Sequence, residues 1–365
     1  LIDLALILFF TKALGIATKK IHMPQIVGAM IAGLLLGPCC FNLVQKSDFL
    51  SCISELGVIG IMFGAGLGVD IKKVLKSFGS SFVIALLGVL VPIGLGTLAV
   101  TLYDGGYSLQ AVFIGIIFTA TSVAISVSTL TEIGHLSSKT GNAILSAAII
   151  DDVLGVIALA AGMSLTDSSI SVMETILNVV VFFIMAFIVG FIVSFLFDKY
   201  VALFKGDKKR FTTFAFAFAL VMAYVAEVYF GISAIVGAFV AGVVLSHNRE
   251  SSYIATKFEV VQYLIFNPVF FASIGLQVSI DGFGWSTLLL ALIYILVAVL
   301  SKVVGCGLGA KICKYSWKES LQIGVGMVGR GEVVLILANI ALEQGIITEE
   351  FLDRLEESNS ETVGS

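Results

Sequence analysis

Apolar runs of about 20 residues follow one another along almost the whole chain, and an α-helix of that length crosses the hydrocarbon core of a membrane. The composition supports this interpretation, because 58% of the 365 residues are hydrophobic and only 13% are charged. The mean hydropathy of +1.08 is far above that of soluble domains. The breaks between the runs predict an all-α polytopic membrane protein with helices near residues 1–18, 24–44, 51–71, 79–103, 109–134, 143–165, 172–204, 211–230, 233–247, 255–280, 284–311 and 318–345.

The loops between these helices differ sharply in positive charge. Because Lys and Arg accumulate on the cytoplasmic side of membrane proteins, this difference predicts the orientation. The even-numbered loops hold only Lys46, and the N-terminus is therefore predicted to lie outside. The first run lacks a charged segment before it and a small-residue cleavage site, so we expect a span there and not a signal peptide. The odd-numbered loops and their helix ends hold Lys19, Lys20, Lys72, Lys73, Lys76, Lys139, Lys199, Lys205, Lys208, Lys209, Arg210, Arg249, Lys257, Lys311, Lys314 and Lys318.

The chain also contains an internal repeat. IVGAMIAGLLLG at 26–37 matches IVGAFVAGVVLS at 235–246, and the same shift of 209 residues aligns 64–71 with 273–280 and 112–118 with 321–327. Between a helix and its copy lie seven crossings, so the copies have opposite orientations, as in many transporters. We predict a first inverted repeat at 1–165, a linker helix and cytoplasmic loop at 166–210, a second repeat at 211–345 that lacks its last helix, and an acidic tail at 346–365.

Polar and glycine-rich stretches interrupt two of the apolar runs at matching places in the repeat. The first is TATSVAISVSTLT at 119–131, and the second is GMVGRGEVVL at 326–335. Interrupted helices free backbone carbonyls near the middle of a membrane, and carbonyl and hydroxyl oxygens are suitable ligands for a small cation. Ser and Thr also pack in ordinary membrane helices. The two stretches together predict a pair of broken helices that meet at a substrate site.

Five charged residues lie deep within the predicted spans. Asp151 and Asp152 lie near the middle of the sixth helix, Lys302 lies in the eleventh, and Arg330 and Glu332 lie in the second interruption. Such charges cost several kcal/mol each and commonly mark ion pathways. A carboxyl group removed from water holds a proton more readily, so one site can bind either a proton or a cation. The structural alternative for Lys302 is a salt bridge that only holds two helices together. For Arg330 and Glu332 it is a cation that satisfies the freed carbonyls and its acidic neighbour within the interrupted helix.

Other classes of function are disfavoured by the same composition. The net charge of −4 includes no basic block, so we expect no nucleic-acid partner. Five cysteines show no metal or redox spacing, and we interpret them as packing residues: Cys39, Cys40, Cys52, Cys306 and Cys313. Competition between a proton and a cation for one site needs no enzymatic step and no cofactor. The pattern therefore predicts a transporter that exchanges a small cation for protons.

At these motifs the sequence resembles the second group of monovalent cation:proton antiporters, and most closely the bacterial electrogenic sodium/proton antiporters. TATSVAIS, the aspartates of IIDD, GISAIVGAFVAG, Lys302 and GRGE occur in the family's order. The resemblance implies two crossing broken helices in a core made of helices four to six and eleven onward. It also implies a dimerisation panel of helices one to three and eight to ten, against which the core moves, in the inner membrane of a bacterium.

Individual roles also follow from the resemblance. It implies that Asp152 binds the cation and the proton, that Asp151 pairs with Lys302, and that Thr121 and Ser122 belong to the crossing-helix site. It also implies a thirteenth helix, which the acidic tail cannot form, so we expect this sequence to be shorter than its relatives. Two alternatives remain, a potassium efflux channel and a sodium-coupled carrier of organic anions, for which Arg330 would face the substrate. The sequence leaves open whether Na⁺, Li⁺ or K⁺ is carried.

Overall fold

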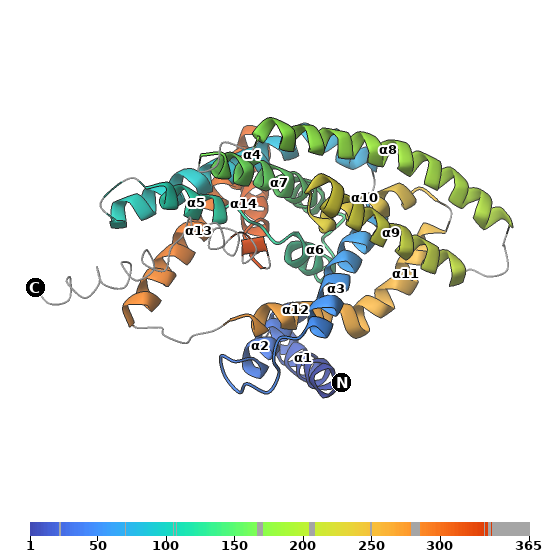
Figure 1. Cartoon of the computed structure of the whole chain (residues 1–365), viewed down its shortest axis with the longest axis horizontal. Helices are drawn as coiled ribbons and strands as arrows, with labels where there is room; N and C mark the ends of the chain where they lie inside the picture. The colour runs from blue at the N-terminus through green and yellow to red at the C-terminus, as the bar shows by residue number, and fades with distance from the viewer. Residues whose placement is uncertain are drawn as a thin grey trace, which may run out of the picture. The chain divides into compact units, whose positions relative to one another are not determined.

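The computed structural model describes residues 1–21, 23–69, 71–104, 106, 108–165, 171–203, 209–248, 250–278, 285–331, 333, 334 and 337. These residues form helices and no strand (Figure 1). The helices are α1 (Ile2–Lys20), α2 (Gln25–Leu36), α3 (Asp48–Leu67), α4 (Ile71–Asp104), α5 (Leu109–Ile117), α6 (Val123–Glu132), α7 (Lys139–Met163), α8 (Val172–Leu203), α9 (Lys209–Phe230), α10 (Ala234–Leu245), α11 (Ser251–Val261), the π-helix η1 (Gln262–Phe266), α12 (Asn267–Leu276), α13 (Trp285–Ile312) and α14 (Trp317–Gly326).

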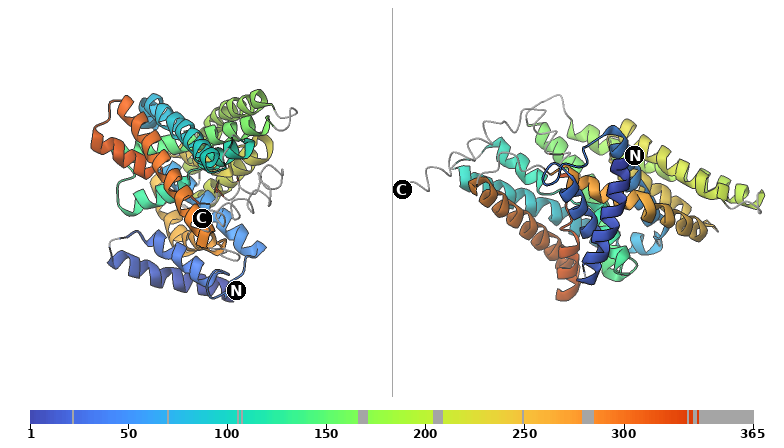
Figure 2. Two further views of the ribbon diagram at one scale, coloured as in Figure 1. Left: turned by 90° about the vertical axis from the view of Figure 1, so that its left-hand side faces the viewer. Right: turned by 90° about the horizontal axis from the view of Figure 1, so that it is seen from below.

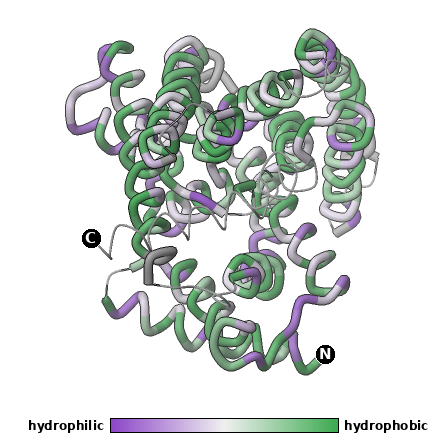
Figure 3. The backbone as a smooth tube through the Cα atoms, turned by 60° about the vertical axis from the view of Figure 1, so that its left-hand side comes forward, coloured by the Kyte–Doolittle hydropathy of each residue, from purple (hydrophilic) through white to green (hydrophobic). Residues whose placement is uncertain are grey.

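The helices follow the predicted membrane spans closely. The fifth predicted span is divided into α5 and α6, whereas α11, η1 and α12 together form one apolar segment. Seven helical segments within the described residues are long and apolar enough to cross a membrane, and apolar residues dominate the helices in Figure 3. The all-α membrane architecture predicted from the sequence is therefore confirmed.

One predicted helix is shorter than expected. The span predicted at 24–44 ends as α2 at Leu36, and Gly37 is already extended, with φ −77° and ψ −176°. Pro38 explains the difference, because helical geometry is disfavoured for the residue before a proline and proline itself cannot donate the next helical hydrogen bond. Several predictions fall outside the described residues, namely most of the loop at 205–210, the second half of the last predicted helix, and the tail at 346–365.

The described helices group into two compact units. The first unit contains residues 1–75, 127–137 and 174–279, and the second contains 76–126, 138–173 and the described residues from 285 on. The first unit thus includes the helices that the resemblance assigned to a panel, and the second includes those assigned to a core. Residues 127–137, which hold most of α6, are the exception because they group with the first unit.

Glycines set the spacing of the helices in the first unit. α1 packs along α2, as both views in Figure 2 show, and α2 also packs against α12. A Cβ atom added at Gly33 of α2 would overlap the carbonyl of Ala272 in α12, and one added at Gly242 of α10 would overlap the carbonyl of Phe63 in α3. Backbones in this unit therefore touch directly, as small residues allow in membrane proteins.

These glycine contacts are reciprocal. The α2–α12 contact between residues 33 and 272 becomes the α10–α3 contact between 242 and 63 when the repeat shift of 209 is applied. A second pair behaves in the same way, because Gly66 lies against Phe239 O and Gly275 lies against Met30 O. The two helix interfaces are thus equivalent under the shift found in the sequence.

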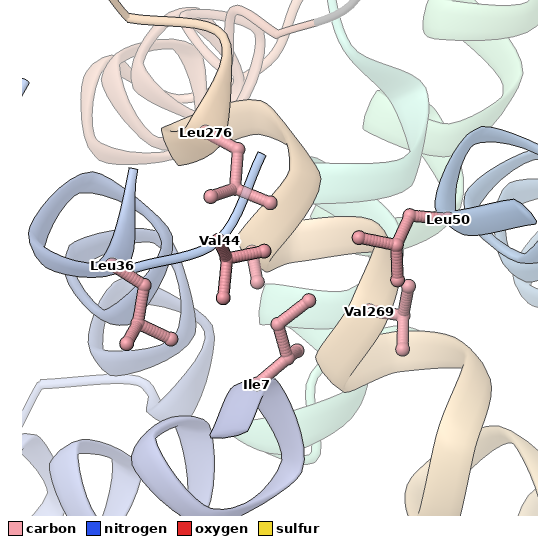
Figure 4. Packing of buried hydrophobic residues seen from close by; sticks show 7 residues of the cluster. Ile7, Leu36, Val44, Leu50, Val269 and Leu276 are labelled. Carbon is pink, nitrogen blue, oxygen red and sulfur yellow. The ribbon is translucent and has the colours of Figure 1, made fainter. Parts of the chain in front are cut away.

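One apolar cluster of the first unit lies between α1, α2, α3 and α12. Side chains from these helices and from the segment after α2 meet there (Figure 4). The cluster consists of Ile7, Leu36, Val44, Leu50, Val269, Ala272 and Leu276.

Candidate functional site

Two interrupted helices meet in the second unit. α5 starts at the N-cap Ser108, whose Oγ accepts the Ala111 N–H at 3.1 Å, and it ends at Ile117. The chain is non-helical until α6 begins at Val123. α14 begins with a capping box at Ser316 and ends at Gly326, after which the chain stays non-helical through Gly331. Both interruptions therefore occur where the polar stretches predicted them.

The two interruptions are hydrogen-bonded to each other. The N–H of Ser122 donates to Gly329 O at 2.7 Å, and Ser126 Oγ donates to Gly326 O at 2.8 Å. Thr121 and Ser122 are both buried at this contact. The predicted contact between broken helices is therefore present, and it brings Thr121 and Ser122 to its centre.

Arg330, in the second interruption, donates to two backbone carbonyls, one in the first interruption and one in α13. Its Nη1 donates to Ala120 O at 2.9 Å in the first interruption, and its Nη2 donates to Ala298 O at 2.8 Å in α13. Ala120 lies in the gap between α5 and α6, so its carbonyl has left the helical hydrogen-bond pattern. This geometry favours the structural alternative for Arg330. Glu332, predicted beside it, lies outside the described residues.

A buried ion pair lies beside the first interruption. Lys302 Nζ of α13 is 2.8 Å from Asp151 Oδ1 and 2.9 Å from Oδ2 of α7. Lys302 is fully buried, and Asp151 is 3% exposed. The pairing suggested by the resemblance is present. A buried pair is stable only where further hydrogen bonds satisfy both groups, because both charges lose their hydration.

Backbone carbonyls complete the surroundings of Lys302. Its ammonium donates to Thr119 O at 2.7 Å and to Gly88 O at 2.9 Å, in addition to Asp151. An ammonium has three hydrogens, so each can meet an acceptor. Thr121, two residues after Thr119, has its Oγ1 3.4 Å from Met327 O of the second interruption, to which it donates. The pair is therefore held by both α4 and the first interruption.

Asp152 has a different environment from its neighbour. It is half-buried, whereas Asp151 is buried. Successive residues of an α-helix point about 100° apart, so the two side chains leave α7 in different directions. Asp151 is thus held in an ion pair, whereas Asp152 is the more exposed residue of the two.

Sequence reasoning missed the contribution of α4. Gly88 is buried, and a Cβ atom added to it would lie 2.5 Å from Cys306 Sγ and 3.6 Å from Asp151 Oδ1. The absence of a side chain at Gly88 therefore lets α13 approach α4. The sequence feature that could have revealed this contribution is Pro92, a proline inside the predicted helix at 79–103.

The first unit contains a separate cavity of about 680 Å³. Lys12 lies on its wall, where its Nζ is 3.1 Å from the ring centroid of Tyr263 and donates to Tyr263 O at 3.0 Å. Glu132, at the end of α6, accepts the Gln25 N–H at 2.8 and 2.9 Å and so caps α2, whose own N-cap is Pro24. These residues belong to none of the motifs found in the sequence.

Interrupted helices that meet around charged side chains are typical of secondary transporters. Comparison with known proteins identifies the kind of transporter that this chain is similar to. Residues 5–354 match the family model of the transmembrane sodium/hydrogen exchangers. The Na⁺/H⁺-K⁺ antiporter GerN of Bacillus cereus is 35% identical over 353 residues, which cover 96% of this chain and 89% of the relative. A Na⁺/H⁺ antiporter of Enterococcus hirae is 33% identical over 360 residues, covering 96% and 92%. The chain belongs to the sodium/hydrogen exchanger family.

Solved structures show the same fold. The sodium proton antiporter MjNhaP1 from Methanocaldococcus jannaschii at pH 8 aligns with a TM-score of 0.67 at 18% identity, covering 97% of this chain and 88% of that one. An electron-microscopy structure of MjNhaP1 aligns with a TM-score of 0.72 at 19% identity, covering 93% and 84%. The antiporter fold is thus confirmed, and the family model with the two relatives confirms a monovalent cation:proton antiporter family.

Proposed function

We propose that this chain is a secondary active antiporter that exchanges protons for Na⁺, or for Li⁺ or K⁺, across the inner membrane of a bacterium. The observation that carries the proposal is the aspartate pair beside the first interruption, in which Lys302 fixes Asp151 and leaves Asp152 more accessible. The printed names of the relatives, which include antiporters for Na⁺ and for K⁺, support these cations as substrates.

In this proposal Asp152 is the group that binds either the proton or the cation. A cation that arrives displaces the proton, and a proton that arrives displaces the cation, so each drives the other across the membrane. Thr121 and Ser122 supply oxygen atoms near the site, and Asp151 with Lys302 sets its charge. Arg330 holds the second interruption in shape through its two backbone acceptors. The cation is a substrate in this scheme, and no cofactor takes part.

The reciprocal glycine contacts support the proposed inverted repeat. Two copies that exchange partners under one shift are related by an approximate twofold rotation, as in an isologous interface. With an odd number of crossings between them, the copies at 1–165 and 211–345 would have opposite orientations in the membrane. We further propose that the N-terminus lies outside and that the protein forms a homodimer.

The orientation has a direct test. A single cysteine placed in residues 205–210 should be protected from an impermeant thiol reagent in intact cells, whereas one near Asp104 should react. The expected pattern follows from the positive-inside rule. Labelling with the opposite sidedness would contradict the proposed orientation.

The exchange has its own test in sealed proteoliposomes that contain a pH-sensitive dye. An inward gradient of each alkali cation in turn should drive protons out and raise the internal pH, even when the membrane potential is clamped at zero. A potassium channel, one of the two alternatives, would move protons only in response to voltage and would give no signal under the clamp. A signal absent for every alkali cation would overturn the proposed function.

A further inference from the structure

Pro92 lies inside α4, four residues after Gly88. In a regular α-helix the carbonyl of residue 88 accepts its hydrogen bond from the N–H of residue 92. Proline has no N–H, and its ring also crowds the carbonyl four residues before it and turns that carbonyl outward. Pro92 thus leaves the carbonyl of Gly88 without its helical donor.

A buried carbonyl without a donor is costly, so Gly88 O needs a partner from elsewhere. Gly88 and Pro92 are both buried. Lys302 Nζ supplies the missing donor at 2.9 Å across a sequence separation of 214 residues. The second carbonyl on the same ammonium, Thr119 O, lies after the end of α5, where the helical pattern is also broken. Two different helix defects therefore supply the two backbone acceptors of one buried charge.

We propose that Pro92 is a positioning residue for the exchange site. By freeing the Gly88 carbonyl it fixes the Lys302 ammonium on Asp151, and Gly88 gives the room for this approach because it has no side chain. The role of the site rests on the proposed function, whereas the coupling between Pro92 and Lys302 rests on the contacts alone. Pro92 touches neither the cation nor the proton that moves.

Replacing Pro92 with Ala tests the coupling between Pro92 and Lys302 separately from the role of the site in transport. The new N–H at position 92 competes with Lys302 for Gly88 O, and the outward push of the ring is removed. In a helix with no ammonium nearby, the same change should be stabilising, since Ala is the best helix former. The effect of Pro92→Ala should therefore depend on whether residue 302 carries an ammonium.

The test is a double-mutant cycle on the full chain with Pro92→Ala, Lys302→Gln and both together, measured as the midpoint of thermal unfolding in detergent. We expect Pro92→Ala to raise the midpoint in the Lys302→Gln background and to raise it less, or to lower it, in the native background. Pro38→Ala, at an exposed turn after α2, is the control and should act equally in both backgrounds. Equal effects of Pro92→Ala in both backgrounds would overturn the inference.

Transport gives a second measurement. Pro92→Ala should displace the pH profile of exchange by about one unit, the tenfold factor that one hydrogen bond to a charged group provides. Pro38→Ala should leave the profile in place, and an unmoved profile in Pro92→Ala would contradict a role at the site.

A Pro92→Ala protein that fails to fold only while Lys302 is present supports the coupling, and failure in both backgrounds contradicts it. If the unaltered protein shows no exchange, the proposed function fails while the thermal cycle still decides the inference.

Discussion

The two units of this protein differ in how buried backbone carbonyls are used. In the first unit, α3 and α10 are continuous helices that touch backbone to backbone at glycines. In the second unit, α4 contains a proline and two helices are interrupted, so buried carbonyls are available to Lys302 and Arg330. The comparison teaches that substitutions in the first unit should change stability, whereas those around the freed carbonyls should change transport.

The largest effect is expected at Asp152. Asp152→Asn keeps the shape of the side chain but removes both the proton site and the anionic oxygen, so exchange should fall to the level of empty liposomes while the protein stays folded. Proton movement driven by an alkali-cation gradient measures this. Asp48→Asn, at an exposed position in the first turn of α3, is the matched control and should leave exchange intact. Exchange retained in Asp152→Asn would remove this residue from its proposed role.

Lys302→Gln should have the next largest effect. It leaves Asp151 buried without its partner, and removing one member of a buried ion pair typically costs about 3–5 kcal/mol of stability. Adding Asp151→Asn should recover part of this loss, because the second change removes the unpaired charge. Thermal unfolding of the single and double variants measures both steps. No recovery in the double variant would show that the loss arises from packing and not from charge.

Lys302→Gln also tests the charge carried in each cycle. If cation arrival breaks the Asp151 to Lys302 pair and Lys302 then releases a proton, exchange moves net charge and responds to the membrane potential. The variant, where it still transports, should then be electroneutral. Currents on a solid-supported membrane, and exchange in vesicles clamped at zero or negative potential, report this. A transport current equal to that of the unaltered protein would leave Lys302 with a structural role only.

Glycine substitutions in the first unit should have a smaller effect, and one confined to stability. Gly33→Ala and Gly242→Ala each place a methyl group against a backbone carbonyl, and we expect each to cost about 1–3 kcal/mol. The two losses should be similar because the contacts are equivalent under the repeat shift. Thermal midpoints, together with exchange per folded molecule, test this. Gly94→Ala, which would meet no atom within 4 Å, is the control and should not destabilise. Clearly unequal losses at 33 and 242 would argue against equivalent interfaces.

The smallest effect is expected for an exposed charge in the second unit. Lys139 Nζ lies 2.8 Å from Glu319 Oε1, but the Lys139 side chain is 64% exposed. Exposed ion pairs contribute little because water and salt screen them. Lys139→Ala should therefore leave both the thermal midpoint and the rate of exchange nearly unchanged. A large loss of exchange would show that position within the unit, and not burial beside freed carbonyls, determines the effect of a charge.

Much of the fold follows from the sequence, because helix spans and interruptions are local features. The apolar runs predicted the helices, and the polar stretches predicted both interruptions. The predicted end of the second span was wrong, because α2 ends at Leu36. The apolar run continues past Pro38, and a span assigned by composition alone takes no account of the proline. The repeat shift was visible in the sequence, but that its glycines pack reciprocally was not.

The site was only partly predictable. Asp151, Lys302 and Thr121 stand out as polar residues in apolar runs. The structure pairs Asp151 with Lys302 and places Thr121 at the contact between the two interruptions. The backbone acceptors of Lys302 do not stand out, because the identity of a residue does not reveal that its carbonyl is free. Gly88 and Thr119 are separated from Lys302 by 214 and 183 residues, so only the packed structure shows these contacts.

Proton release on Na⁺ binding tests the central claim most directly. Calorimetric titration of the purified protein with NaCl, in two buffers of different ionisation enthalpy, measures how many protons leave as the cation binds. Competition at Asp152 predicts that Na⁺ binding releases protons and that Asp152→Asn abolishes both the binding and the release. Na⁺ binding without proton release, or release that persists in Asp152→Asn, would contradict the account.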